Sequence, residues 1–147
     1  MRTGVKAILV ALLLATACAA TALAAQTTDS PDKLTAGYAG VPWGATVPQF
    51  NNLRPGILVD GHTKNPEKFF GKNADVVYVP TNTGKWYRMI VFVSDQDRNE
   101  LKAMFANALG SPQGDGAQWY VDNVRIGFAA GGPIFIEGKV GGSFVGK

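Results

Sequence analysis

The chain has 147 residues and carries 14 Lys and Arg against 11 Asp and Glu. It contains one cysteine, Cys18, and one histidine, His62. This composition excludes an intramolecular disulfide framework, a thiolate zinc site and a multi-histidine metal centre, so no metal and no cofactor are expected.

The first 24 residues have the pattern of a bacterial secretory signal peptide. Arg2 and Lys6 form a short basic head, residues 7–17 are almost entirely apolar, and Ala22-Leu23-Ala24 places small residues where a signal peptidase reads. The apolar run is shorter than the roughly 20 residues that span a bilayer. A buried N-terminal helix is the less favoured alternative. We therefore expect a periplasmic or secreted protein without a transmembrane span.

Cys18 leaves open a lipid anchor. The large aliphatic residue expected before an acylated cysteine stands one place too early, at Leu14. Soluble export is therefore favoured over a lipoprotein.

Removing the signal peptide also changes the charge. Arg2 and Lys6 leave with it, so that 12 basic residues remain against 11 acidic ones. No cluster of Lys and Arg remains in the sequence, and a surface that tracks phosphates, as nucleic acid requires, is not indicated.

The mature chain is long enough for one domain. Residues 25–36 are polar and lack periodicity, which is typical of a flexible linker. We expect a single domain over residues 37–138 and a loose glycine-rich tail over residues 139–147.

The first helix is predicted just after Thr46. Thr46 and Gln49 form a capping-box pattern, and Pro55-Gly56 ends the helical stretch. Residues 57–59 are a candidate short strand, and residues 60–71 have the composition of an irregular loop.

Residues 74–93 predict a β-hairpin with its turn at residues 81–84. Placing Tyr78 opposite Tyr87 gives one face made of Val76, Tyr78, Tyr87, Met89, Val91 and Val93, and another made of Val77, Val79, Trp86, Arg88, Ile90 and Phe92. Both faces are largely apolar. This pattern suits a central strand covered on both sides, or a strand with one face kept for a partner.

A second helix is predicted from Asp95 or Asp97, either of which could cap it, to a C-cap at Gly110. Its apolar residues have helical spacing and predict one buried stripe. The stripe consists of Leu101, Met104, Phe105, Ala108 and Leu109.

Residues 117–128 predict a second hairpin, with a two-residue turn at Asp122-Asn123 that sets Trp119 opposite Ile126. A last strand is expected over residues 133–137. A two-residue turn before it would direct Glu137 to the core, whereas a three-residue turn would direct Ile134 and Ile136 there. We prefer the second, because burial of an unpaired carboxylate is costly.

These elements predict an α+β domain: a single antiparallel sheet of about five or six strands with two helices, in an order that suggests a tandem α-β-β-β arrangement. This layout resembles the β-lactamase-inhibitor-protein-like fold. Residues 40–46 (GVPWGAT) and 109–112 (LGSP) also resemble the start and the helix end of small exported bacterial proteins that begin G-[VI]-x-W-G-x-[ST]. That resemblance implies no catalytic residues.

Three patterns are weak candidates for chemistry. His62 near Asp60 could form a base or metal site, but a loop histidine is the simpler interpretation. Asp95, Asp97 and Glu100 resemble part of a calcium loop that lacks its glycine and its distal glutamate, so helix capping is favoured. The glycine-rich C-terminal segment lacks the lysine-serine pair and the helix of a phosphate-binding loop.

The strongest binding candidate is a patch of aromatic and guanidinium side chains, which are enriched at binding hot spots. Its expected members are Trp86, Arg88, Ile90 and Phe92 on one strand and Tyr120 and Arg125 on another hairpin. The alternative is that Trp86 is buried under a loop and that Arg88 forms a salt bridge. Trp43 is a further candidate, although a role as a core anchor is favoured.

The sequence therefore favours an exported, non-enzymatic module that docks a protein partner in the bacterial envelope. A binder of small molecules or glycans that uses Trp43, Trp86 and Trp119 is the alternative, and an enzyme that uses Asp60 and His62 is the least favoured.

Overall fold

The computed structural model describes residues 30–114 and 117–145. The predicted signal peptide and Cys18 lie outside the described residues. The elements follow the chain as η1 (Pro31–Thr35), β1 (Gly37–Tyr38), β2 (Val41–Pro42), α2 (Val47–Leu53), β3 (Asn65–Phe69), β4 (Lys72–Pro80), β5 (Trp86–Phe92), α3 (Asp95–Leu109), β6 (Gln118–Val121), β7 (Val124–Phe128) and β8 (Ile134–Gly138).

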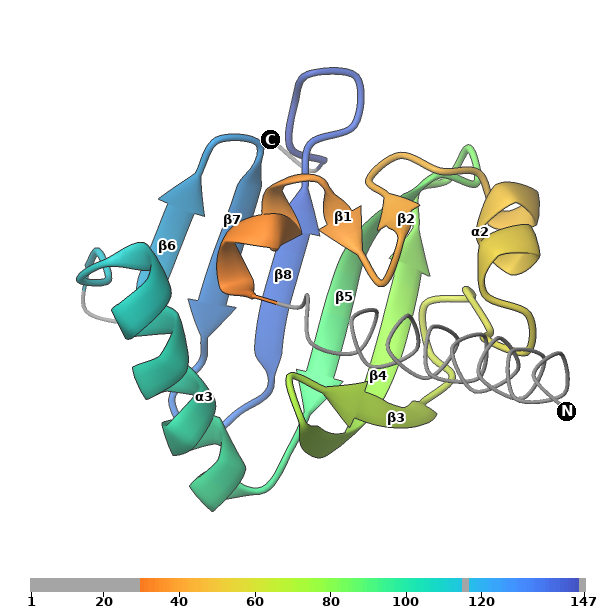
Figure 1. Ribbon diagram of the computed structural model, residues 1–147. Helices are drawn as coiled ribbons and strands as arrows, with labels where there is room; N and C mark the ends of the chain where they lie inside the picture. Colours follow the sequence, from red (N-terminus) through yellow and green to blue (C-terminus); the bar gives the residue numbers. More distant parts are fainter. Residues whose placement is uncertain (1–29, 115–116, 146–147) are drawn as a thin grey trace, which may run out of the picture.

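The α+β prediction is confirmed. The described residues form a six-stranded antiparallel sheet in the order β3-β4-β5-β8-β7-β6, together with a two-stranded sheet of β1 and β2. Each half of the chain is a helix followed by three strands, and the last strands of the two halves, β5 and β8, pair at the centre (Figure 1).

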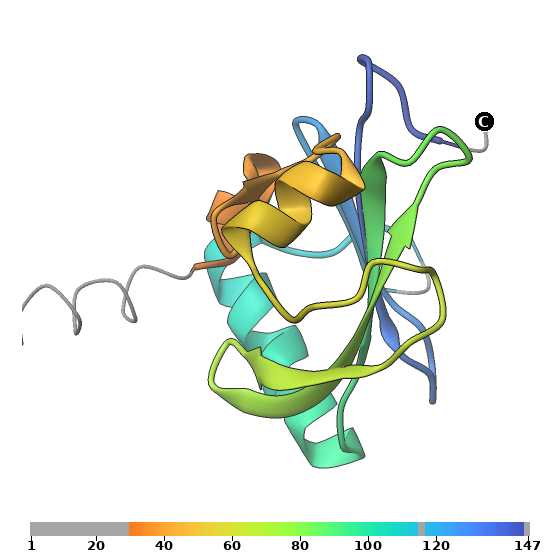
Figure 2. The same cartoon turned by 90° about the vertical axis from the view of Figure 1, so that its right-hand side faces the viewer.

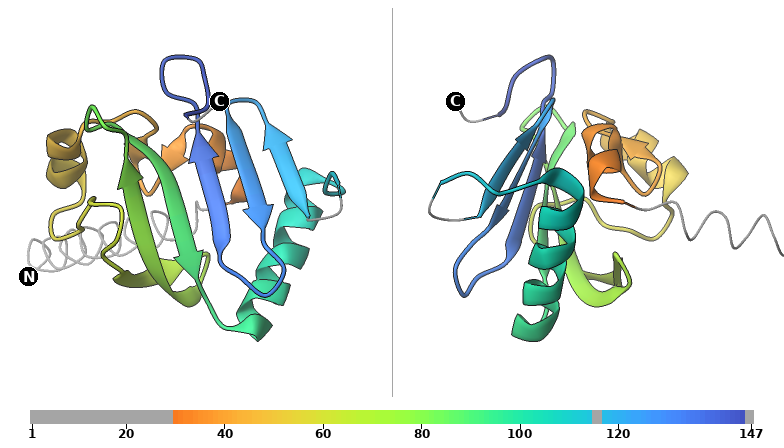
Figure 3. Two further views of the ribbon diagram at one scale, coloured as in Figure 1. Left: turned by 180° about the vertical axis from the view of Figure 1, so that it is seen from behind. Right: turned by 60° about the vertical axis from the view of Figure 1, so that its left-hand side comes forward.

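The domain has two layers. Both α-helices, η1 and the β1–β2 hairpin lie on one face of the large sheet, here called the core face (Figure 2). No helix lies on the opposite face, here called the open face, within the described part of the chain (Figure 3).

The core is built from alternate residues of the strands. Tyr78, Met89, Val91, Ile134 and Ile136 are fully buried. They meet Phe50 of α2 and Leu101 and Phe105 of α3, which are also fully buried. Burial of each large apolar side chain contributes roughly 1.5–3 kcal/mol, so this layer contact holds the sheet and the helices together.

The capping predictions are partly confirmed. Thr46 and Gln49 form the predicted capping box at the start of α2. Ser94, rather than Asp95 or Asp97, caps α3, because its side chain accepts the hydrogen bond from the Asp97 N–H. In the predicted α3 stripe Ala108 is exposed, whereas Leu101 and Phe105 are buried.

The segment between α2 and β4 differs from the prediction. Residues 57–59 form no strand, and residues 65–69, which were expected to be irregular, form β3. Asn65 explains the change: its buried side-chain amide accepts from the Leu58 N–H and donates to the Leu58 and Val76 carbonyl groups. One polar side chain thus satisfies backbone groups of the loop while β3 pairs with β4.

The segment before the predicted domain is also structured. From Ser30 onward, the expected linker forms η1, and Leu34 is only 2% exposed. The Leu34 carbonyl accepts a hydrogen bond of 2.7 Å from the Trp43 indole N–H. At the other end, Val140 and Ser143 pair across a turn in the expected loose tail. The ordered domain therefore extends beyond residues 37–138 on both sides.

Candidate functional site

Two cross-strand rows of side chains define the middle of the open face. The polar row runs across five strands through Val79, Arg88, Glu137, Arg125 and Tyr120. The apolar row lies one pleat away and runs through Val77, Ile90, Phe135, Gly127 and Gln118. Residues paired across antiparallel strands share a face, so each row is a continuous line of neighbours.

The centre of the polar row is a buried carboxylate between two arginines. Glu137 is 4% exposed. Its Oε1 accepts from Arg88 Nε at 2.7 Å and also from Arg88 Nη2, whereas its Oε2 accepts from Arg125 at 2.9 Å (Nε) and 2.6 Å (Nη2). Each arginine donates two hydrogen bonds to one oxygen of the carboxylate, so the carboxylate is fully satisfied and both guanidinium groups are held beside it. The cluster retains one net positive charge.

Each guanidinium also has aromatic neighbours. The Arg88 guanidinium carbon lies 5.8 Å from the centre of the Tyr87 ring and 5.9 Å from that of Phe135. The Arg125 guanidinium carbon lies 4.8 Å from the centre of the Phe144 ring. These contacts orient the two arginines further and place apolar surface beside their charge.

The apolar row has a gap at Gly127. A Cβ atom built on Gly127 would meet no atom within 4 Å. A pocket of about 290 Å³ opens there, and Tyr120, Arg125 and Phe135 are among the residues that line it. The gap at Gly127 is therefore a hollow bordered by the Phe135 ring, the Tyr120 phenol and the Arg125 guanidinium.

The predicted patch is partly assembled. Arg88, Ile90 and Arg125 lie in the two rows, and Tyr120 ends the polar row with 49% of its surface exposed. Phe92 lies one further pleat along β5, where the Lys64 ammonium is 4.4 Å from the centre of its ring. The alternative interpretation of Arg88, a salt bridge, also holds: Arg88 pairs with Glu137 while about a third of its side chain, 34%, stays exposed.

The placement of Trp86 on the open face is wrong. Val79 pairs with Arg88 but Pro80 pairs with Trp86, so β5 has one extra residue at Tyr87. Such a bulge reverses the alternation beyond it and turns Trp86 to the core face. The Trp86 side chain is fully buried, and its indole N–H donates to the Arg88 carbonyl.

Trp43 is a core anchor rather than part of the patch. It stacks on Trp86 from the core side, with ring centroids 4.2 Å apart. Trp119 is 3% exposed and donates its indole N–H to the Gly110 carbonyl. The indoles of Trp86 and Trp119 are therefore closed to a stacking ligand, whereas Trp43 is only partly buried.

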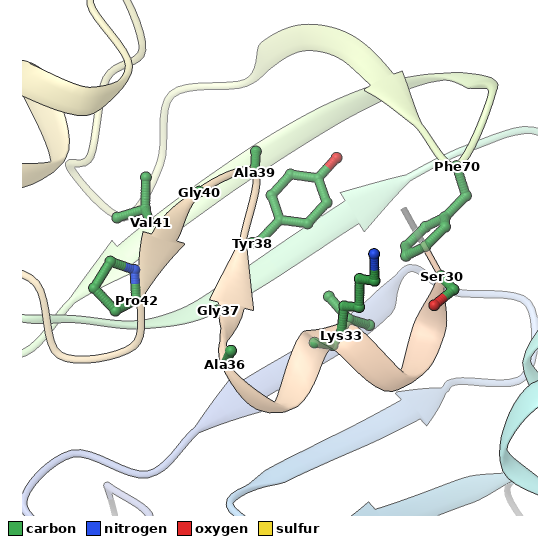
Figure 4. A pocket seen from close by; sticks show the side chains of 11 residues that line it. Ser30, Lys33, Ala36, Gly37, Tyr38, Ala39, Gly40, Val41, Pro42 and Phe70 are labelled. Atoms are coloured by element: carbon green, nitrogen blue, oxygen red, sulfur yellow. The ribbon is translucent and has the colours of Figure 1, made fainter. Parts of the chain in front are cut away.

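A second pocket, of about 390 Å³, lies on the other side of the molecule. Lys33 of η1, Tyr38 of β1 and Phe70 of the β3–β4 turn point toward the same space (Figure 4). None of the predicted site residues lines this pocket.

The weak candidates for chemistry have structural explanations. The Asp60 carboxylate accepts hydrogen bonds from Thr63 and from the His62 N–H, and these bonds, led by the Thr63 side chain, lower the pKa of Asp60 to about 2. A carboxylate with such a low pKa is a poor general base at neutral pH. Asp97 and Glu100 both pair with Lys72, a contact that ties α3 to β4.

Sequence reasoning missed Glu137, Gly127 and Phe135 as members of the site. Glu137 lies off the core face, as predicted, but it is buried between the two arginines. The available signal was the presence of Arg88 and Arg125 on outward-facing strand positions, since two cations can neutralise a buried carboxylate between them.

In the described part of the chain, no helix is both long and apolar enough to cross a membrane, and no three or more His, Cys, Asp or Glu side chains gather as a metal-binding group. No family model, curated protein or solved structure matches this chain.

Proposed function

We propose that this protein is an exported, non-enzymatic binding module that docks an acidic protein partner of the bacterial envelope on the open face of its sheet. Export rests on the signal-peptide pattern of residues 1–24. The docking surface rests on one observation above all: the polar and apolar rows cross the sheet on the face where none of the described helices lies.

The composition of this face supports a protein as the partner. Tyr120, Phe135, Ile90 and two arginines supply the residue types that dominate protein-binding hot spots. Arg88 and Arg125 are held by Glu137, so little side-chain entropy is lost when they meet a partner.

The charge of the face supports an acidic partner. The open-face residues of its described strands, together with the residues that directly precede or follow these strands, carry six basic side chains against three acidic ones. The basic side chains are those of Lys64, Lys68, Lys85, Arg88, Arg125 and Lys139, and the acidic ones are those of Asp75, Asp122 and the buried Glu137. The mature sequence as a whole is nearly neutral, so the positive charge is concentrated here and can steer an acidic surface toward this face.

Site-specific photo-crosslinking in the native bacterium tests the proposal. A benzophenone amino acid placed at Phe135 should form an adduct with one defined protein. The matched control carries it at Lys102, an exposed position of α3 on the helical side, and should give no such adduct. The purified partner should then bind the wild-type domain. Adducts from Lys102 alone, or from neither position, would rule out docking on the open face.

A further inference from the structure

The hollow at Gly127 and the two arginines beside it are close enough to act on neighbouring groups of one ligand. Arg125 and Gly127 are two residues apart on β7, which places them about 7 Å apart along the strand. Phe135 pairs directly with Gly127, and Glu137 pairs directly with Arg125. The hollow and the cationic cluster therefore form adjoining parts of a single surface.

The hollow has the size and lining for an apolar side chain. Its volume is about 290 Å³, whereas a cavity of about 150 Å³ already admits benzene. The Phe135 ring forms one wall, and the absence of a side chain at Gly127 leaves the floor open. Gly127 has no positive φ that would require glycine, so backbone conformation does not account for the gap.

The cluster has donors left over for a second carboxylate. Each arginine uses Nε and Nη2 to hold Glu137. Neither Nη1 group donates a hydrogen bond to any of residues 30–114 or 117–145. Since a guanidinium carries five N–H donors and the cluster keeps a net positive charge, an incoming carboxylate would find both donors and attraction.

We propose that this surface recognises an acidic segment of the partner protein, with an aromatic or large aliphatic side chain in the Gly127 hollow and an adjacent carboxylate on Arg88 and Arg125. This inference rests on the proposed function, and it states which chemical groups of the partner would bind to the open face. A partner peptide fits better than a polyphosphate chain, because half of the surface is apolar and only two guanidinium groups are present.

A titration of the 15N-labelled mature protein tests the recognition. The probe is the capped peptide Ac-Ser-Glu-Phe-Glu-Ser-amide, compared with one that carries Gln in place of both Glu and one that carries Ala in place of Phe. The acidic aromatic peptide should shift the amide resonances of Arg125, Gly127 and Phe135. Each altered peptide should bind about tenfold more weakly, because it lacks either the charge or the buried ring.

Two variants connect the effect to the hollow and to the cluster. Gly127→Val places a side chain in the hollow, where an added Cβ atom has no other atom within 4 Å, and should weaken binding of the acidic aromatic peptide about tenfold. Asn73→Val, a similar apolar addition at an exposed open-face position of β4, is the matched control and should leave binding unchanged. Arg125→Gln removes one of the two guanidinium groups that would receive the peptide carboxylate, leaves Glu137 paired with Arg88, and should weaken binding of the acidic peptide about tenfold.

Unchanged affinity in Gly127→Val or in Arg125→Gln, or equal binding of the Gln-containing peptide, would overturn the proposal. So would equally tight binding of succinate, which would reduce the surface to a simple anion site. These outcomes are separate from failure of the proposed function. Crosslinking from Phe135 to a partner that binds Gly127→Val normally would keep open-face docking and reject only this mode of recognition.

Discussion

Trp43 and Trp86 stack face to face, with ring centroids 4.2 Å apart and planes at 25°. Phe50 meets the Trp86 ring edge-on, with ring centroids 5.3 Å apart. The stack links the segment after β2 to the first residue of β5, so it fastens the N-terminal part of the helical layer to the sheet.

Replacement of Trp86 by Ala should therefore lower the free energy of unfolding by about 3–5 kcal/mol, as expected for a fully buried aromatic residue. Urea unfolding followed by circular dichroism measures the change. Trp43→Phe is the matched control: it keeps a stacked ring but loses the hydrogen bond to the Leu34 carbonyl, and should cost only about 1 kcal/mol. Equal losses of unfolding free energy in Trp86→Ala and Trp43→Phe would contradict this prediction.

Gly138 provides a test of close packing under the same stack. A Cβ atom at Gly138 would lie 2.1 Å from Cγ and Cδ2 of Trp43. Gly138→Ala should destabilise the domain by about 1–3 kcal/mol or more, because the indole or the strand must move. Gly127→Ala, on the neighbouring strand β7, adds a Cβ atom that has no other atom within 4 Å, so it should change the melting temperature little. A neutral Gly138→Ala variant would show that Trp43 can shift freely.

The Arg88–Glu137–Arg125 cluster predicts strong non-additivity. Either Arg88→Gln or Arg125→Gln leaves Glu137 paired with the other arginine, so each single variant should lower the free energy of unfolding only slightly. The double variant leaves a buried carboxylate unpaired and should cost about 3 kcal/mol or more. Adding Glu137→Gln to the double variant should recover most of the loss. Chemical denaturation of all the variants provides the measurement, and simple additivity would argue against a shared carboxylate.

Tyr78 predicts a fall in stability at alkaline pH. Burial, together with the neighbouring Glu67 carboxylate, raises the pKa of Tyr78 well above its ordinary value. As the pH rises through about 10, the unfolded chain releases this phenol proton while the folded chain keeps it. The contribution of Tyr78 is therefore complete below pH about 10 and is lost above it, at a rate that approaches about 1.4 kcal/mol per pH unit.

Tyr78→Phe isolates this contribution, since the variant lacks the titrating group. It also loses the hydrogen bonds that the hydroxyl makes with Arg54 and Glu67, and should cost about 1–3 kcal/mol at neutral pH. Unfolding free energies measured from pH 8 to 11 should converge for the wild type and the variant as the pH rises. Parallel curves would exclude a raised pKa at Tyr78.

The β6–β7 hairpin and the start of α2 were predictable in detail. Trp119 lies opposite Ile126 as expected, and Thr46 caps the helix with Gln49 as expected. In both cases neighbouring residues decide the outcome: a two-residue turn sets the register, and a hydroxyl reaches an N–H three residues away. Ile134 and Ile136 also reach the core face as predicted, because the alternative would have sent Glu137 there.

The register of the β4–β5 hairpin was only partly predictable, because a contact between residues distant in the sequence decides part of it. Tyr78 pairs with Met89 instead of Tyr87, a shift that keeps Val76, Tyr78, Met89 and Val91 on the core face. The bulge at Tyr87 turns Trp86 to the core face, and the Tyr87 ring, which was predicted to share a face with Met89, lies beside the Arg88 guanidinium. The stack with Trp43 stabilises that bulge, and Trp43 is more than forty residues away in the sequence. The alternation of apolar and polar residues along one strand carries no information about a contact between residues so far apart in the sequence.

The sequence by itself determined the class of the fold, the start of α2, the tight β6–β7 hairpin and the residue types of the candidate patch, because each of these depends on interactions within a few residues. Only the tertiary structure decided that β5 lies beside β8, and therefore that Arg88 and Arg125 share Glu137 next to the hollow at Gly127. Strands that are distant in the sequence become neighbours through the packing of the whole core, which no local pattern specifies.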